Sequence, residues 1–148
     1  MANCILGFND RAIEYFNYIN PIEHSRTKDA IKKYKVEPYV IAADMYGVSN
    51  LAGRGGWTWY TGSSSWFIKV GIEEILGFKI ENGYLIINPR VPESWKEYKI
   101  RYKYKNSIYI IKIKNNSMAK NVFSNNNEKP PKIKLEDNNR INEIKLEI

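Results

Sequence analysis

Cysteine and histidine are nearly absent from the sequence. Cys4 is the only cysteine among the 148 residues, which excludes an intramolecular disulfide and a zinc site built from several cysteines. We expect it to be a buried, inert thiol. His24 is the only histidine, so no second imidazole is present for a metal site. We therefore predict no metal site, and we expect His24 to be a hydrogen-bonded structural residue.

Long hydrophobic runs are also missing. No uninterrupted apolar stretch approaches the roughly 20 residues of a membrane span. The N-terminal residues lack the basic region and the apolar length of a secretory signal. We therefore expect no membrane span in this chain and a cytoplasmic location. At 43% hydrophobic residues, the composition is too apolar for a disordered chain and predicts a buried core.

Charge is unevenly distributed along the chain. The formal net charge is +7, and seven basic residues stand between Lys96 and Lys114 with one acid, Glu97. Tyrosines interleave with these basic residues, a pattern compatible with a nucleic-acid surface. Residues 98–104, however, alternate strictly between polar and apolar, which favours a strand with one buried and one solvated face. We therefore expect no nucleic-acid partner, and nucleic-acid binding is the lowest-ranked alternative.

The first half of the chain has helical periodicity. Apolar spacing predicts helices over residues 10–19, 27–34, 38–46 and 63–76. Asp10 is the expected N-cap of the first helix, and Pro21 follows its end. Ser63 or Ser64 is expected to cap the last helix, and Gly77 to end it. Glycine-rich residues 47–56 are predicted to form a loop.

After Gly77 the apolar period changes from 3.6 to 2, which is typical of strands. We predict strands over residues 84–88, 99–104, 108–114, 132–135 and 143–148. The second and third of these are expected to form a hairpin across residues 105–107, and residues 115–127 to contain loops. A helical half followed by a strand half indicates an α+β fold.

A glycine- and tryptophan-rich loop is the segment whose residues best suit binding of an anion and a sugar. Residues 53–60 lead into Thr61-Gly62 and then into a predicted helix N-terminus. Unpaired amides at a helix start, the helix dipole and a threonine hydroxyl suit an anion such as phosphate. Trp57 and Trp59 offer flat faces on which a sugar ring could stack. Such loops also cap helices without binding anything, and tryptophans are often core residues, so both readings stay open at this point.

Carboxylates elsewhere are weaker candidates. Glu37 is suited equally to a sugar hydroxyl or to capping a helix. Asp44 lies in an apolar segment and should be paired or line a cavity. Glu73 and Glu74 are adjacent on a helix and should point in different directions, so we do not expect a carboxylate pair for glycoside hydrolysis.

Several motifs resemble the C-terminal part of glycoside hydrolase family 94, the inverting glycoside phosphorylases. The similarity is greatest to the branch of cyclic β-1,2-glucan synthases and β-1,2-oligoglucan phosphorylases. The most specific matching pieces are Glu-Pro-Tyr-Val at residues 37–40 and Gly-Arg-Gly-Gly-Trp-Thr-Trp-Tyr-Thr-Gly at residues 53–62. Further matches are Asp10-Arg11-Ala12, Asn20-Pro21-Ile22 with His24, Ile75-Leu76-Gly77 and Ile87-Asn88-Pro89.

The resemblance implies an architecture and an activity. Residues 1–78 would be the last helices of an (α/α)6 barrel, and residues 79–148 a C-terminal jelly-roll-like β-sandwich. The family cleaves a β-glucosidic bond with inorganic phosphate and inverts the anomeric centre, or runs the reverse reaction from a sugar 1-phosphate. The implied partners are a β-glucan or β-gluco-oligosaccharide and phosphate, which is a co-substrate, and no cofactor is implied.

The resemblance also assigns site residues. The family's phosphate-binding Thr-Gly pair corresponds to Thr61 and Gly62, and the sugar-site motifs contain Glu37, Arg54, Trp57 and Trp59. The family's catalytic aspartate, which acts as general acid, lies upstream and has no counterpart here. We therefore predict no catalytic residue in this chain.

These departures predict that the chain is the C-terminal part of a longer enzyme, and the missing N-terminal part of that enzyme is a further expected partner. We expect no phosphorolysis by the isolated chain. We also expect exposed apolar helix faces that make it associate. The alternative is a non-catalytic carbohydrate-binding module that recognises glucan through the sandwich and the aromatic loop.

Overall fold

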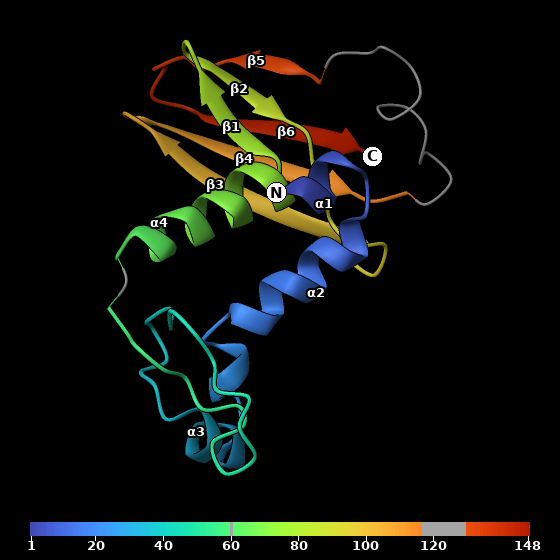
Figure 1. Cartoon of the computed structure of the whole chain (residues 1–148). Helices are drawn as coiled ribbons and strands as arrows, with labels where there is room; N and C mark the ends of the chain where they lie inside the picture. Colours follow the sequence, from blue (N-terminus) through green and yellow to red (C-terminus); the bar gives the residue numbers. More distant parts are fainter. Residues whose placement is uncertain (60, 117–129) are drawn as a thin grey trace.

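The computed structural model describes residues 1–59, 61–116 and 130–148. The helical elements precede the strands (Figure 1) and are α1 (Ala2–Ile5), α2 (Asn9–Ile19), η1 (Glu23–Ser25), α3 (Lys28–Tyr34), α4 (Thr61–Lys69) and η2 (Val70–Ile75). The strands are β1 (Phe78–Glu81), β2 (Tyr84–Ile87), β3 (Glu97–Tyr104), β4 (Ser107–Lys114), β5 (Lys132–Lys134) and β6 (Ile141–Glu147). This mixture confirms the α+β class, while the barrel and jelly-roll architectures stay predictions.

Two three-stranded sheets form the second half. One has the order β1-β2-β5 and the other β3-β4-β6, and all pairs are antiparallel except β4 with β6. The sheets enclose a core to which β2 contributes Leu85 and Ile87, and β4 contributes Tyr109, Ile111 and Ile113. Burying each aliphatic side chain contributes about 1.5–3 kcal/mol, so this core is the main stabilising feature of the sheets.

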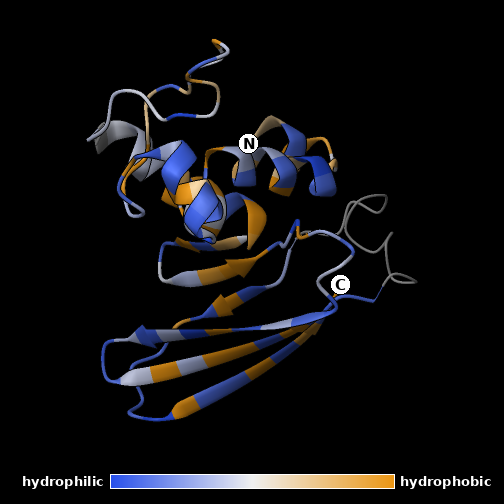
Figure 2. Cartoon of the chain, turned by 90° about the horizontal axis from the view of Figure 1, so that it is seen from below, coloured by the Kyte–Doolittle hydropathy of each residue, from blue (hydrophilic) through white to orange (hydrophobic). Residues whose placement is uncertain are grey.

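The predicted hairpin of the basic stretch is confirmed. β3 and β4 pair from Glu97↔Lys114 to Tyr104↔Ser107, so the connecting loop is Lys105-Asn106. The inward-facing Tyr98 and Tyr102 are half-buried, while Lys99 between them is exposed. Figure 2 shows the alternation of apolar and polar positions along these strands. The strand with one solvated face is therefore the correct interpretation of the charge pattern.

A second hairpin was not predicted from the sequence. β1 pairs with β2 across Asn82-Gly83, where both residues have positive φ, 50° and 79°. An Asn-Gly pair with left-handed φ values is the favoured two-residue turn, because its twist matches that of the strands. The predicted strands at 132–135 and 143–148 are present as β5 and β6. The predicted loop over residues 115–127 falls mostly outside the described residues.

Helices α2 and α3 match the predicted ranges. Thr27 caps α3, its hydroxyl oxygen accepting the Ala30 amide at 3.1 Å. The expected cap of α2 is wrong: the helix begins at Asn9 after Phe8, so Asp10 lies in the first turn, where its charge still complements the helix dipole.

The predicted helix over residues 38–46 is wrong. Its backbone pairs with the glycine-rich loop instead: the Ala43 amide donates to the Trp57 carbonyl at 2.7 Å, and the Tyr46 amide to the Arg54 carbonyl at 2.9 Å. An antiparallel bridge joins Met45 and Gly55 between these bonds. Amides used in this way cannot form intrahelical hydrogen bonds.

The last helix starts earlier than predicted and changes from an α-helix to a π-helix. α4 begins at Thr61, so Ser63 and Ser64 lie inside it rather than at its cap, and η2 continues it as a π-helical turn. Gly77 ends the helical segment with a φ of 64°, as predicted. Within the part described, no helix is both long and apolar enough to span a bilayer.

A smaller core joins the helices to the sheets. Cys4, Ala12, Ile75 and Val91 are buried together. The Phe16 ring of α2 stacks on the Phe67 ring of α4, with centroids 3.9 Å apart. Phe16 and Phe67 also line an apolar groove of about 480 Å³ between α1, α2 and α4. It is lined by Tyr15, Ile19, Trp66 and their neighbours, several of which are exposed.

Candidate functional site

Residues 43–57 form a compact backbone scaffold beside α3, at the end of the molecule away from the sheets (Figure 1). Asp44 is its central residue. Its carbonyl accepts the Gly56 amide at 2.9 Å, and its carboxylate Oδ1 accepts the Trp57 amide at 3.1 Å. Asp44 is therefore partnered, as expected, although its side chain is exposed. Its hydrogen bonds hold the start of the tryptophan segment in place.

Glycine is required where the scaffold meets its neighbours. The Gly55 amide donates to the Tyr34 carbonyl at 2.9 Å, and a Cβ at Gly55 would overlap the Val36 side chain. A Cβ at Gly56 would overlap the Asp44 carboxylate. The glycine-rich sequence is thus explained by close packing as well as by backbone freedom.

Alanine at Gly56 should therefore displace the Asp44 carboxylate and release the Trp57 amide. We expect Gly56→Ala to cost about 1 kcal/mol, the net value of one hydrogen bond, and to speed hydrogen exchange at the Trp57 amide. Gly47→Ala is the matched control, because a Cβ there meets no atom within 4 Å. Equal exchange rates at Trp57 in both variants would contradict the role of Asp44.

Exposed aromatic rings follow the scaffold. Trp57 is 73% exposed and Trp59 is 65% exposed, so neither is a core residue. The Trp59 ring meets the Tyr39 ring edge to face, with centroids 6.3 Å apart, and Tyr39 is itself 73% exposed. Trp59 also has a φ of 64°, a costly conformation for a bulky residue. Two segments far apart in sequence thus present rings side by side.

Tyr39 was not among the residues predicted for the site. It belongs to the Glu-Pro-Tyr-Val motif that also contains Glu37, and this membership was the only available signal. Glu37 is half-buried and Arg54 is exposed. Neither side chain forms an ion pair or hydrogen bond within the described residues, so both are available to a ligand.

The remaining predicted residues stand at the start of α4. Thr61 is the first residue of that helix, and Gly62 is exposed. The structure therefore places Trp59 against Tyr39, in the same segment as Glu37. Arg54 and Trp57 both belong to the backbone scaffold of residues 43–57. The structure shows no direct contact between Gly62 and Glu37 or Arg54.

His24 and Cys4 have structural roles. His24 stacks on Tyr34 with centroids 4.6 Å apart, and its Nε2 lies 2.8 Å from the Tyr18 carbonyl oxygen, which confirms the structural interpretation. Cys4 is 1% exposed, and burial raises the pKa of its thiol. In the described part of the chain, no cluster of three potential ligands could hold a metal ion.

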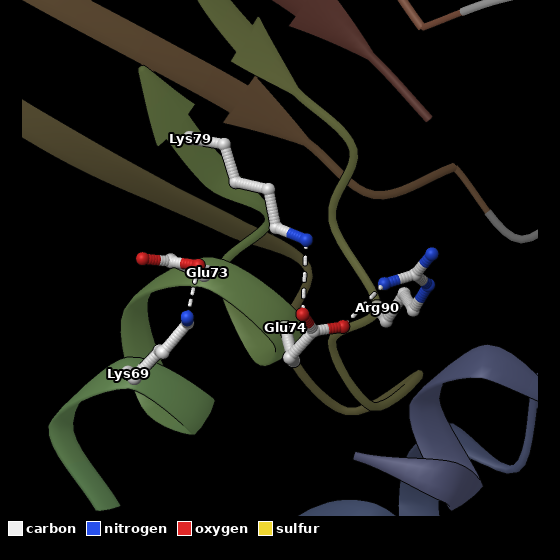
Figure 3. Close-up of polar contacts among 5 residues, drawn as sticks. All are labelled: Lys69, Glu73, Glu74, Lys79 and Arg90. Carbon is white, nitrogen blue, oxygen red and sulfur yellow. Dashed lines mark hydrogen bonds and ion pairs between the residues drawn. The ribbon is translucent and has the colours of Figure 1, made fainter. Parts of the chain in front are cut away.

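Glu73 and Glu74 point apart, as predicted (Figure 3). Glu73 pairs with Lys69 at 3.9 Å, whereas Glu74 accepts Lys79 Nζ at 2.9 Å and Arg90 Nη1 at 3.1 Å. Burial alone would raise the pKa of Glu74, but the hydrogen bond from Lys79 and the two positive charges outweigh it and lower the pKa. Glu74 is thus a buried structural anion.

Comparison with known families matches both halves of the chain. The family profile described as "Glycosyl hydrolase 94 superfamily, catalytic domain" matches residues 1–77, and "Glycosyl hydrolase family 65, C-terminal domain" matches residues 78–138. The chain belongs to the glycosyl hydrolase 94 superfamily, which confirms the resemblance seen in its motifs.

Individual relatives include one synthase and several phosphorylases. The chain is 40% identical over 110 residues to the cyclic beta-(1,2)-glucan synthase NdvB of Rhizobium meliloti. It is 29% identical over 126 residues to the N,N'-diacetylchitobiose phosphorylase of Vibrio furnissii, and 27% over 122 residues to the solabiose phosphorylase of Paenibacillus borealis. These alignments cover 74%, 84% and 78% of the chain but only 4%, 15% and 15% of the relatives.

Proposed function

We propose that this chain forms one part of the substrate site of a glycoside phosphorylase or of an enzyme resembling cyclic β-glucan synthase. In this reaction phosphate would attack the anomeric carbon of a β-glucoside as the glucosidic bond breaks, giving a sugar 1-phosphate and the released, protonated leaving alcohol, or the reverse reaction would occur. The observation that carries the proposal is the exposed Trp59–Tyr39 ring pair beside a glycine-rich segment that leads into α4. Membership of the glycosyl hydrolase 94 superfamily supports it.

Phosphate is proposed to bind at Thr61 and Gly62. The first amides of α4 have no intrahelical acceptors, and the helix dipole favours an anion there. Gly62 leaves this end open, since a Cβ at that position would meet no atom within 4 Å. Inorganic phosphate would be a co-substrate, and no other cofactor is proposed.

A glucosyl unit is proposed to stack on the aromatic rings. Trp59 and Tyr39 present apolar faces at a fixed mutual angle, which suits the flat face of a sugar ring. Exposed Trp57 is proposed to extend this surface, and Glu37 and Arg54 are proposed to offer an acceptor and donors for hydroxyl groups.

The general acid is proposed to come from a segment outside these 148 residues. The chain spans about one twenty-fifth to one seventh of the relatives' lengths, so most of their sequence has no counterpart here. The apolar groove between α1, α2 and α4 offers a surface for further helices. In this proposal residues 1–78 complete an (α/α)6 barrel, and residues 79–148 form a jelly-roll-like sandwich.

Ligand binding by the purified chain tests the sugar surface. We expect β-1,2-gluco-oligosaccharides to bind weakly in a calorimetric titration, and Trp59→Ala to reduce the affinity about tenfold through loss of the stacking contact. Trp66→Ala is the matched control, because Trp66 is 59% exposed but lies on α4 away from the ring pair. Equal affinities for the two variants would contradict the proposed surface.

The purified chain also tests whether the general acid lies outside these 148 residues. We expect no sugar 1-phosphate from these oligosaccharides and phosphate, since the general acid is proposed to lie elsewhere. Formation of sugar 1-phosphate by the isolated chain would overturn that part of the proposal while leaving the sugar surface intact.

A further inference from the structure

The outward face of the β3–β4–β6 sheet carries two charged rows that run across all three strands. The first row is formed by the register pairs Lys99↔Lys112 and Lys112↔Lys145. The second is formed by Glu97↔Lys114 and Lys114↔Glu147. Between them lies a depression of about 460 Å³, floored by the strand segment of Tyr98, Ile113 and Leu146. We call this depression, with its two rows, the lysine trough.

The lysine row is electrostatically unfavourable in the protein alone. Neighbouring strands are about 4.8 Å apart, and like charges directly opposite each other destabilise a sheet. Lys112 pairs with Glu143 at 3.0 Å, an exposed pair of little energetic value. The side chains of Lys99 and Lys145 form no hydrogen bond or ion pair within the described residues. An anion placed over the row would remove this repulsion.

The second row selects against long polyanions. The carboxylates of Glu97 and Glu147 lie on the same face as the lysines. A nucleic acid or an anionic bilayer that lay along the sheet would therefore be repelled by these two carboxylates while it contacted the lysines. The tyrosines of β3 face inward, where Tyr98 and Tyr102 pack against the core, so they offer no exposed platform for bases. A small ligand with one anionic end meets neither obstacle.

We propose that the lysine trough binds the phosphate monoester of a small polyol. The phosphate would lie over the lysine row, where ammonium groups donate charge-assisted hydrogen bonds. Hydroxyl groups of the ligand would donate to the carboxylates of Glu97 and Glu147. This site is independent of the proposed function, because it is formed by residues of β3, β4 and β6, whereas the loop that leads into α4 lies away from the sheets.

Nuclear magnetic resonance titration of the full chain with glucose 6-phosphate tests this site. We expect saturable shifts at amides of β3, β4 and β6, with at least tenfold weaker binding of inorganic phosphate and no shifts with glucose. Amides at the start of α4 report separately on the proposed phosphate site, so the two proposals succeed or fail independently. Absence of shifts in the strands, or equal affinity for inorganic phosphate, would overturn the proposal.

A double variant locates the binding energy. Lys99→Thr/Lys145→Thr keeps β-forming residues and removes two like charges, so we expect an unchanged or higher melting temperature and at least tenfold weaker ester binding. Lys103→Thr is the matched control, since Lys103 is exposed on the same face of β3 but does not line the trough. Equal losses in both variants would indicate general charge attraction and would also overturn the site.

Discussion

Alanine at position 77 is expected to lower the free energy of unfolding by about 3 kcal/mol. Gly77 has a φ of 64°, which costs a residue with a side chain about 1–2 kcal/mol. In addition, a Cβ there would overlap the backbone carbonyl of Asn88. This carbonyl cannot rotate away, because the Asn88 amide donates to the Gly77 carbonyl at 2.9 Å and holds the two segments together. Chemical denaturation of Gly77→Ala measures the loss.

Gly83→Ala separates the two contributions. Gly83 has a φ of 79°, but a Cβ there meets no atom within 4 Å, so only the backbone conformation is penalised. We expect a loss of about 1 kcal/mol for this control. A loss for Gly77→Ala no larger than that of Gly83→Ala would contradict the close approach of the two segments.

Replacement of Glu74 by alanine is expected to cost about 3 kcal/mol at neutral pH. The Glu74 side chain is 6% exposed and lies between two cations, Lys79 of β1 and Arg90 beyond β2 (Figure 3). Its removal leaves two positive charges facing each other in a largely buried site. Arg90 also donates its amide to the Ile75 carbonyl at 2.9 Å, so the ion network reinforces the same junction. Thermal and chemical unfolding of Glu74→Ala report the loss.

The pH dependence of this loss has a defined sign. The pKa of Glu74 is lower in the folded protein than its ordinary value of 4.5, so its contribution is complete above that value. The contribution disappears as the pH falls through the lower folded pKa, and the stabilities of wild type and variant should converge there. Glu73→Ala is the control, because its exposed pair with Lys69 should contribute less than 1 kcal/mol at any pH. A constant difference between wild type and Glu74→Ala from neutral to acid pH would refute the assignment.

Local patterns predicted the elements that local interactions stabilise. The alternation in residues 98–104 and the turn that follows were sufficient for the β3–β4 hairpin, because side-chain direction in a strand has a period of two. The Asn82-Gly83 turn is an equally clear sequence signal for the β1–β2 hairpin. The helix expected over residues 38–46 failed for the opposite reason. Its apolar content is helical in spacing, yet its amides pair with residues far along the chain.

The sequence motifs predict which residues form the candidate site, but not how they are arranged. Glu37, Arg54, Trp57, Trp59, Thr61 and Gly62 were all identified from motifs. The exposure of Trp57 and Trp59, the contact of Tyr39 with Trp59, and the hydrogen bond from the Trp57 amide to Asp44 appear only in the tertiary structure. The lysine trough could not be predicted from the sequence either, because its rows form only when the three strands pair in this register.

The sequence by itself determined the family, the α+β composition, the solvated basic strand face and the glycine-rich loop, because motifs, periodicity and turn residues act over a few neighbouring positions. Only the tertiary structure decided which tryptophans are exposed, how η2 is joined to the sheet through Glu74, and where lysines from three strands meet. Those features depend on contacts between segments far apart in the sequence, and the energy of each contact depends on the side chains of both segments.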